Sequence, residues 1–127
     1  MNKMEDMVDI ELKPRPESVA QARGAVGDLL DGVARRPREA VRLIISELVT
    51  NAVRNGPEKP IFLRVSRDPE TIRGEVEDQG EGRVAIGRSA KGNVSGGYGL
   101  RLVDAVSTSW GVQQGSTRVW FEVSLQS

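Results

Sequence analysis

The sequence predicts an α+β fold, a two-layer α/β sandwich in which a mixed, mostly antiparallel sheet is covered on one face by about three helices. Some segments alternate apolar and polar residues, others repeat apolar residues at helical spacing, and their order is strand, helix, helix, hairpin, loop, helix, hairpin. A chain of 127 residues suits one domain with one hydrophobic core. We therefore expect a single domain over residues 1–127, with residues 1–7 flexible.

The first strand is predicted at 8–12, where apolar and acidic residues alternate. From 17 to 33 the apolar residues fall at helical spacing, which predicts the first helix. Gly24 and Gly27 interrupt this segment, and each weakens a helix by about 1 kcal/mol relative to Ala. Their presence predicts a close neighbour that needs their small size.

A second helix is predicted to begin at Pro37, because the fixed φ of Pro suits the first helical position, and to carry Glu39 in its first turn. Asn55-Gly56-Pro57 supplies a C-cap and a helix breaker, so the helix is expected to end there. The apolar stripe of this helix consists of Val41, Ile44, Ile45, Leu48, Val49 and Ala52.

An antiparallel hairpin is predicted from two alternating segments, 61–66 and 72–78, joined by a turn around Asp68-Pro69. The segment 79–96 that follows is rich in Gly, Ser, Lys and Arg. Loops of this length in compact domains are often functional, so we expect a lid over a binding site.

The C-terminal part is predicted to hold a short third helix, built on Leu100, Leu102, Val103, Val106 and Ser107. Two strands are expected after it, near 109–113 and 117–125, with a turn at Gln114-Gly115-Ser116.

The composition excludes several classes of chemistry. The 18 basic and 18 acidic residues balance, so nothing favours nucleic acid as a direct partner. No apolar run approaches the roughly 20 residues of a membrane helix and the start does not read as a secretory signal, so we expect a cytoplasmic protein without membrane contact. Cys and His are absent, which excludes thiolate and imidazole chemistry and favours an oxygen-liganded ion such as Mg²⁺.

Glu47 and Asn51 lie one helical turn apart, at the edge of the apolar stripe of the second helix. At such an edge a carboxylate can act as a general base and an amide oxygen can bind Mg²⁺. The simpler alternative is a solvated pair at the boundary of the core.

Asp78 ends the second strand of the predicted hairpin, in phase with the buried positions of that strand. A carboxylate that points inward needs hydrogen-bond donors, and an adenine amino group is one. The alternative is an Asx-turn at the strand end.

Gly80 and Gly82 follow Asp78 and allow close backbone approach. The loose G-x-G-x-x-A pattern that begins at Gly80 is discounted, because a hairpin strand precedes it rather than the first strand of a βαβ unit.

Gly96-Gly97-Tyr98-Gly99 precedes the third helix, where free N–H groups and the helix dipole favour a phosphate. The alternative is a lid hinge, which is compatible with the same role. Thr117 is in phase with the apolar residues of the last strand, and is either a pocket residue or an ordinary strand residue. The two tryptophans, Trp110 and Trp120, are expected to pack in the core or at an edge rather than against a ligand.

The three motifs, in this order, resemble the N, G1 and G2 boxes of the GHKL (Bergerat-fold, histidine kinase-like) ATPases, and in particular the anti-sigma-factor serine/threonine kinase type. The resemblance covers residues 8–125. It is carried by Ser46-Glu47-Leu48-Val49-Thr50-Asn51-Ala52-Val53-Arg54, by Asp78-Gln79-Gly80-Glu81-Gly82, by Gly97-Tyr98-Gly99-Leu100-Arg101-Leu102-Val103-Asp104 with Ser109-Trp110-Gly111-Val112, and by Gly115-Ser116-Thr117-Arg118-Val119-Trp120-Phe121.

The resemblance implies ATP and Mg²⁺ as cofactors, Asn51 as the metal ligand, Glu47 as the catalytic base and Asp78 as the acceptor of the adenine amino group. The segment 79–96 would be the ATP lid. The nucleotide-binding residues that it implies are Asn51, Asp78, Gly80, Gly82, Gly97, Gly99, Leu100 and Thr117.

The function that the resemblance implies is an anti-sigma-factor-like serine/threonine kinase, which binds a sigma factor or similar regulator and phosphorylates an antagonist protein. A homodimer is expected on the same ground. The alternative is a nucleotide-binding partner-switch module without catalysis, favoured by Asn55 and Ser95 at positions where such kinases often have His and Arg. A histidine-kinase fragment is a weaker third possibility, because the chain has no His to accept phosphate.

Overall fold

The computed structural model describes residues 6–80, 98–113 and 117–125, and the order of its elements is the predicted one. The segments 81–96 of the expected lid and 1–5 of the expected flexible start lie outside the described residues. The elements are β1 (Met7–Leu12), α1 (Ser18–Ala25), α2 (Arg35–Asn55), β2 (Ile61–Arg67), β3 (Thr71–Glu77), α3 (Tyr98–Val106), β4 (Ser109–Val112) and β5 (Val119–Ser124).

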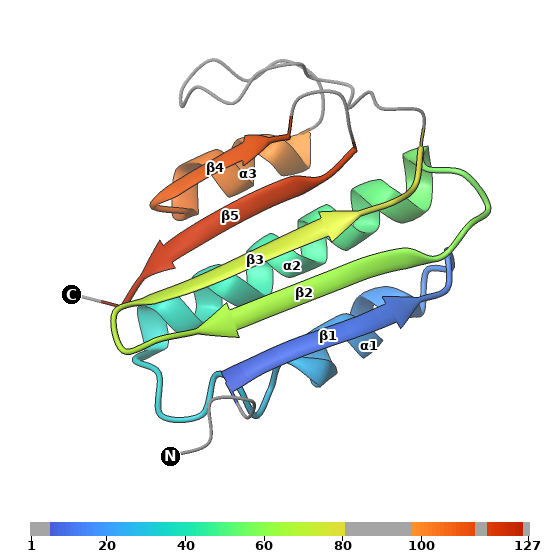
Figure 1. The fold of residues 1–127 in the computed structure, drawn as a ribbon. Coiled ribbons are helices and arrows are strands. Elements are labelled where there is room, and N and C mark those ends of the chain that lie inside the picture. Colours follow the sequence, from blue (N-terminus) through green and yellow to red (C-terminus); the bar gives the residue numbers. More distant parts are fainter. Residues whose placement is uncertain (1–5, 81–97, 114–116, 126–127) are drawn as a thin grey trace.

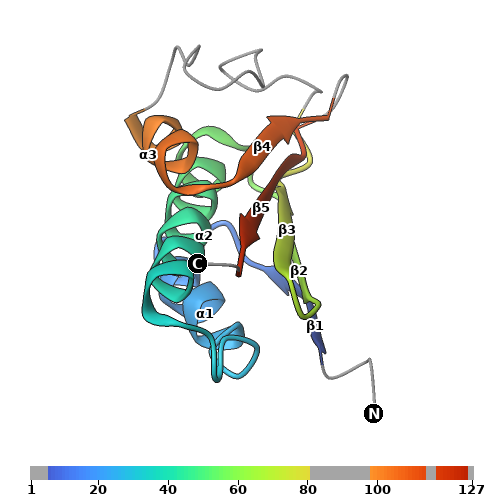
Figure 2. The same cartoon turned by 90° about the vertical axis from the view of Figure 1, so that its left-hand side faces the viewer.

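The strands form one sheet in the order β1-β2-β3-β5-β4, and the three helices lie together on one of its faces (Figures 1 and 2). The predicted α+β two-layer fold is confirmed. Every neighbouring pair of strands is antiparallel, so the expectation of a mixed sheet is wrong. Each connection between paired neighbours is a hairpin or passes over the helical layer, and none of them forms the crossover that a parallel pair needs.

The core lies between the sheet and α2, whose predicted apolar stripe is buried along its whole length. Strand residues alternate so that one face of the sheet is apolar and packs on the helices. Gly74 of β3 lies opposite Phe121 of β5, and a Cβ at this glycine would come within 2.5 Å of the phenyl ring. The missing side chain therefore leaves the space that the largest fully buried residue occupies.

The first helix is shorter than predicted. α1 ends at Ala25, and turns continue the chain to Gly32, which has a φ of +80° that suits Gly. An added Cβ at Gly24 would meet nothing, so the expected close neighbour is absent there. At Gly27 it would come 3.2 Å from the carbonyl oxygen of Gly24, so the neighbour is the turn itself.

The second helix begins earlier than predicted, at Arg35 rather than at Pro37. Pro37 is its third residue, which is allowed because the N–H groups of the first turn have no acceptor within the helix. Glu39 consequently lies outside the first turn, which contains no acid.

β1 begins at Met7, so the last residue of the segment that was expected to be flexible belongs to a strand. None of the helices in the described part of the chain has the length and apolar character that crossing a bilayer requires.

Candidate functional site

Asp78 follows directly after β3, and its side chain organises the chain at this point. Its Oδ1 accepts a hydrogen bond of 2.8 Å from the N–H of Gly80, so the Asx-turn considered as an alternative is present. Gln79 between them has a φ of 64°, and its Nε2 donates a hydrogen bond of 2.7 Å to the carbonyl of Pro60. The turn is therefore held both by its own carboxylate and by the chain that leads into β2.

The end of α2 abuts the same carboxylate. A Cβ placed on Gly56 would come 2.9 Å from Oδ2 of Asp78 and 2.6 Å from the carbonyl oxygen of Ala52. Gly56 has an ordinary φ of −87°, and its N–H donates to Ala52. The glycine is thus required by close approach and not by a left-handed backbone.

Thr117 completes this cluster from the segment just before β5. Its side chain is buried as its phase predicts, with 7% exposed. Its Cγ2 lies 3.1 Å from the position that a Cβ on Gly80 would take, and Oδ1 of Asp78 lies at the same distance from that position. We refer to Gly56, Asp78, Gly80 and Thr117 as the Asp78 cluster. It joins three segments that are far apart in the sequence.

The Asp78 cluster keeps one carboxylate oxygen available. Oδ1 is occupied by Gly80, but no described residue donates a hydrogen bond to Oδ2. The residue is only half-buried, so this oxygen can accept from a ligand. The Asx-turn and a ligand-binding role are therefore compatible, because they use different oxygens of one carboxylate.

Glu47 and Asn51 are half-buried and lie on α2, one turn apart as predicted. With a rise of about 1.5 Å per residue, Asn51 precedes Gly56 by about 8 Å along the helix axis, and Glu47 precedes it by about 14 Å. Within the described ranges neither side chain has a hydrogen-bond partner that would orient it. The two side chains thus lie along the helix that ends at the Asp78 cluster.

The remaining predicted residues belong to the segment before α3. Gly82 and Gly97 lie outside the described residues, whereas Gly99 and Leu100 fall in the first turn of α3. Among the described residues there is no group of three acids that could hold a metal ion.

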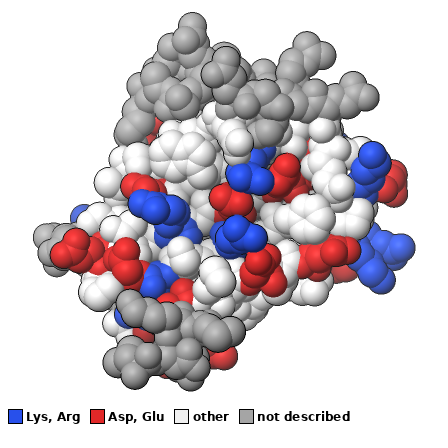
Figure 3. Space-filling view, viewed as in Figure 1, with Lys and Arg blue, Asp and Glu red and all other residues white. Residues whose placement is uncertain are grey.

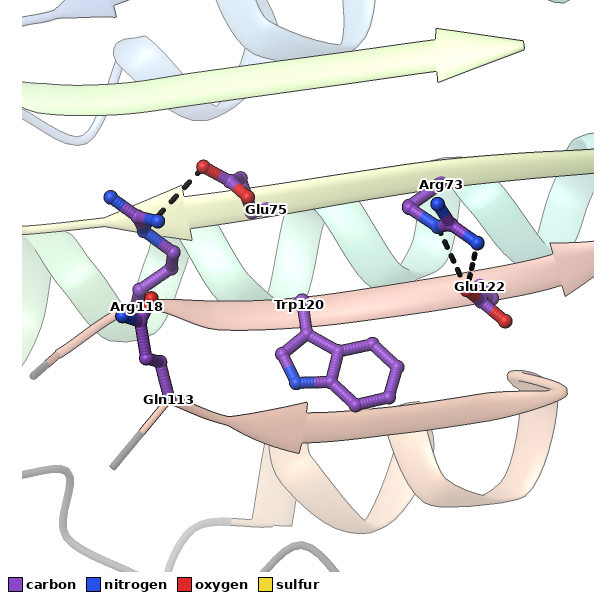
Figure 4. A pocket seen from close by; sticks show the side chains of 6 residues that line it. All are labelled: Arg73, Glu75, Gln113, Arg118, Trp120 and Glu122. Atoms are coloured by element: carbon purple, nitrogen blue, oxygen red, sulfur yellow. Dashed lines mark hydrogen bonds and ion pairs between the residues drawn. The ribbon is translucent and has the colours of Figure 1, made fainter. Parts of the chain in front are cut away.

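A hollow of about 400 Å³ on the open face of the sheet is a different kind of site (Figure 4). Its charged side chains pair with one another, Arg73 with Glu122 at 2.7 Å and Arg118 with Glu75 at 3.5 Å, around the half-buried Trp120. Acidic and basic groups are interspersed with uncharged residues over the described part of this face (Figure 3). The described residues of this hollow therefore form no basic patch for a phosphate or a nucleic acid.

The sequence matches the family model of the histidine kinase-like ATPase domain over residues 12–123. The chain belongs to this family. Membership in the histidine kinase-like ATPase family implies that the domain binds ATP, and the resemblance read from the three motifs is confirmed at this level.

Among solved structures, this histidine kinase-like ATPase domain is similar to the crystal structure of the RsbU and RsbW domains of Rv1364c from Mycobacterium tuberculosis, with a TM-score of 0.66 and 17% identity. The match covers 93% of this chain and 31% of the other, so this chain spans less than a third of the length of the chain that it matches. At this identity the likeness shows the fold. No curated protein matches the sequence significantly.

Gly56 is the one member of the Asp78 cluster that the sequence did not indicate as a site residue. A glycine between the end of a helix and a proline reads as a C-cap, which is how we interpreted it. Nothing local distinguishes a C-cap from a glycine required by a carboxylate 22 positions later in the chain (78 − 56 = 22).

Proposed function

We propose that this histidine kinase-like ATPase domain is an ATP- and Mg²⁺-dependent serine/threonine protein kinase of the anti-sigma-factor type. The observation that carries the proposal is the Asp78 cluster, in which a carboxylate with one available oxygen is enclosed by two glycines and a buried threonine. The available oxygen suits the amino group of adenine, and the two glycines let the backbone approach this carboxylate closely.

Asp78 would accept a hydrogen bond from the adenine amino group at Oδ2, and Gly80 and Thr117, which lie close to this carboxylate, would border the ring. Gly82 would shape the same pocket, and Gly97, Gly99 and Leu100 would lie by the phosphates. GTP carries a carbonyl oxygen where ATP carries the amino group, so a carboxylate here would also select against GTP.

Asn51 would hold Mg²⁺ through its amide oxygen, with nucleotide phosphates and water as the other ligands. This fits the absence of a three-acid cluster in the described ranges, because Mg²⁺ at nucleotide sites takes few protein ligands. When bound, the metal ion neutralises phosphate charge. Glu47 would take the proton from a serine hydroxyl while the serine oxygen attacks the γ-phosphate and ADP departs.

The partner class follows from the family resemblance rather than from the site. A sigma factor or similar regulator would be the protein bound, and an antagonist protein would supply the serine. The likeness in fold to a structure that contains an RsbW domain supports this proposal. A homodimer is proposed on the same basis, and a cytoplasmic location is proposed because no apolar run in the sequence reaches the length of a membrane helix.

A nucleotide-binding partner switch without catalysis is the second candidate. The observation that favours it is the absence of any described hydrogen-bond partner for Glu47, since an effective base is normally oriented by a second group. Asn55, which stands where His is common in such kinases, is exposed at the end of α2.

The experiment that separates the two candidates compares wild type with Glu47→Ala, using γ-labelled ATP and candidate antagonist proteins. If Glu47 is the base, the variant keeps its ATP affinity, and phosphoserine formation falls by about 10²–10⁴-fold. Glu17→Ala is the control, at an exposed glutamate next to α1 and outside both candidate sites. Absence of phosphoserine with wild type, despite ATP binding, would establish the partner switch.

A further inference from the structure

A second hollow, of about 630 Å³, lies on the helical side of the molecule, between the first half of α2 and the end of α3. Because Ala105 and Val106 of α3 face residues 35–43 of α2, the end of one helix meets the beginning of the other. We refer to this hollow as the α2–α3 groove. Its lining residues are Arg35, Arg36, Glu39, Ala40, Leu43, Ala105 and Val106.

The α2–α3 groove has an apolar floor and a basic rim. The floor is formed by two alanines, a leucine and a valine, while Arg35 and Arg36 are exposed and have no ion-pair partner among the described residues. Glu39 is the acid of the lining, and its carboxylate already lies 3.4 Å from Arg42. The groove therefore carries a net positive charge.

The position of the two arginines is unfavourable for the helix itself. They occupy the first turn of α2, where the helix dipole is positive, and this turn contains neither an acid nor a capping side chain. Local stability alone favours acids at these positions. An anionic group from another molecule would relieve the conflict.

The α2–α3 groove also lies in line with the candidate catalytic residues. Arg36, Ala40, Leu43, Glu47 and Asn51 follow one another at intervals of three or four residues and thus share one face of α2. Glu47 is about 6 Å further along the axis than Leu43. A segment held in the groove would extend toward the carboxylate that we propose as the base.

We propose that the α2–α3 groove binds an acidic amphipathic helix of a partner protein. Apolar residues of that helix would fill the floor, and its acids would pair with Arg35 and Arg36, as in other helix-in-groove complexes. A nucleic acid fits the apolar floor poorly. Only the delivery of an acceptor toward Glu47 rests on the proposed kinase function, because docking itself needs no nucleotide.

The test uses the full chain without nucleotide and two synthetic amphipathic peptides with the same leucine stripe, one flanked by glutamates and the other by lysines. Fluorescence anisotropy is expected to show binding of the glutamate peptide, and at least about tenfold weaker binding of the lysine peptide. The double variant Arg35→Glu/Arg36→Glu is expected to bind the glutamate peptide about tenfold or more weakly than wild type does.

The matched control is Arg15→Glu/Arg23→Glu. It makes the same change in net charge at exposed arginines in and before α1, which lies on the other side of α2 from α3 (Figures 1 and 2). This control is expected to keep the peptide affinity. Backbone amide shifts on peptide addition are expected at residues 35–43 and 101–106.

Several outcomes would overturn the proposal: equal affinity for the two peptides, no binding of either, equal weakening by both double variants, or shifts confined to the open face of the sheet. A DNA duplex that binds in place of the glutamate peptide and is lost in Arg35→Glu/Arg36→Glu would also overturn it. Because ATP affinity is measured separately on the same proteins, a failure of docking is distinguishable from a failure of ATP binding.

Discussion

Asp78 has two tasks, one for each carboxylate oxygen. Oδ1 closes the turn to Gly80, whereas Oδ2 lies beside Gly56 without a described donor. A conservative change to the amide therefore tests the ligand-binding role more cleanly than a truncation does, because the amide oxygen can still accept from Gly80.

Asp78→Asn is expected to weaken ATP binding by about 10–100-fold, since a hydrogen bond to a charged group is worth about 1.5–3 kcal/mol. The measurement is calorimetric titration with ATP and with GTP, and the preference for ATP should fall in the variant. Glu77→Gln is the control, because Glu77 precedes Asp78 but points to the open face, where it pairs with Arg118 at 3.1 Å. Equal ATP affinity in Asp78→Asn and wild type would remove the adenine assignment.

Gly56→Ala is expected to destabilise the fold by about 1–3 kcal/mol and to weaken ATP binding. The added methyl group would press on the carbonyl of Ala52 and on the Asp78 carboxylate. Denaturant unfolding measures the first effect and nucleotide titration the second. Gly24→Ala is the control with the opposite expectation. The added methyl group meets no other atom, and Ala favours a helix such as α1 more than Gly does. This variant should therefore raise the free energy of unfolding by about 0.5–1 kcal/mol. If Gly56→Ala changed neither the free energy of unfolding nor the ATP affinity, the end of α2 would not lie in tight contact with Asp78.

At the scale of residues, the sequence revealed which face of a strand each side chain lies on. The inward positions of Asp78 and Thr117 follow from alternation along strands, which depends only on neighbouring residues. The role of Gly56 and the free oxygen of Asp78 depend on contacts between distant segments. No periodicity encodes such contacts, so they could not be predicted.

At the scale of elements, the helices were predictable in number and type but not in their ends. The apolar stripe of α2 identified the helix, whereas its first residue was misplaced because Pro37 is compatible with several positions of a first turn. The segment 26–33 keeps helical spacing of apolar residues yet forms turns that bury Leu29 and Leu30. Burial overrode the helical pattern there.

The beginning of α2 makes a prediction about charge. Arg35→Glu/Arg36→Glu is expected to raise the free energy of unfolding by roughly 1 kcal/mol at low salt, because each acid interacts favourably with the helix dipole at this end. Arg54→Glu, in the last turn of the same helix, should lower it by a similar amount. Denaturant unfolding at low and high salt checks both, and both effects should shrink with salt. A loss of stability in the double variant would show that the two arginines stabilise the isolated fold.

At the scale of the whole molecule, sequence order did not reveal which edge of the sheet the last hairpin joins. β5 pairs with β3, which places β4 at the edge and Thr117 beside Gly80. The predicted pocket depends on this pairing, because β3 and β5 supply two of its three sides. The candidate site is therefore a product of topology as much as of motifs.

A site assembled from the end of α2, the end of β3 and the start of β5 exists only in the folded chain, so ATP should bind the native state and not the unfolded one. At a concentration of about 100 times the dissociation constant, such a ligand adds about 2.7 kcal/mol to the free energy of unfolding. For a domain of this size that corresponds to a rise in Tm of roughly 10 °C. Thermal unfolding with ATP and with ADP, each with and without Mg²⁺, measures this rise.

At the same ATP concentration Asp78→Asn should show a much smaller rise in Tm and Glu77→Gln the full one. An unchanged Tm with every nucleotide would contradict ATP binding, whereas a rise with ATP that is independent of Mg²⁺ would keep the adenine pocket and remove Asn51 as a metal ligand.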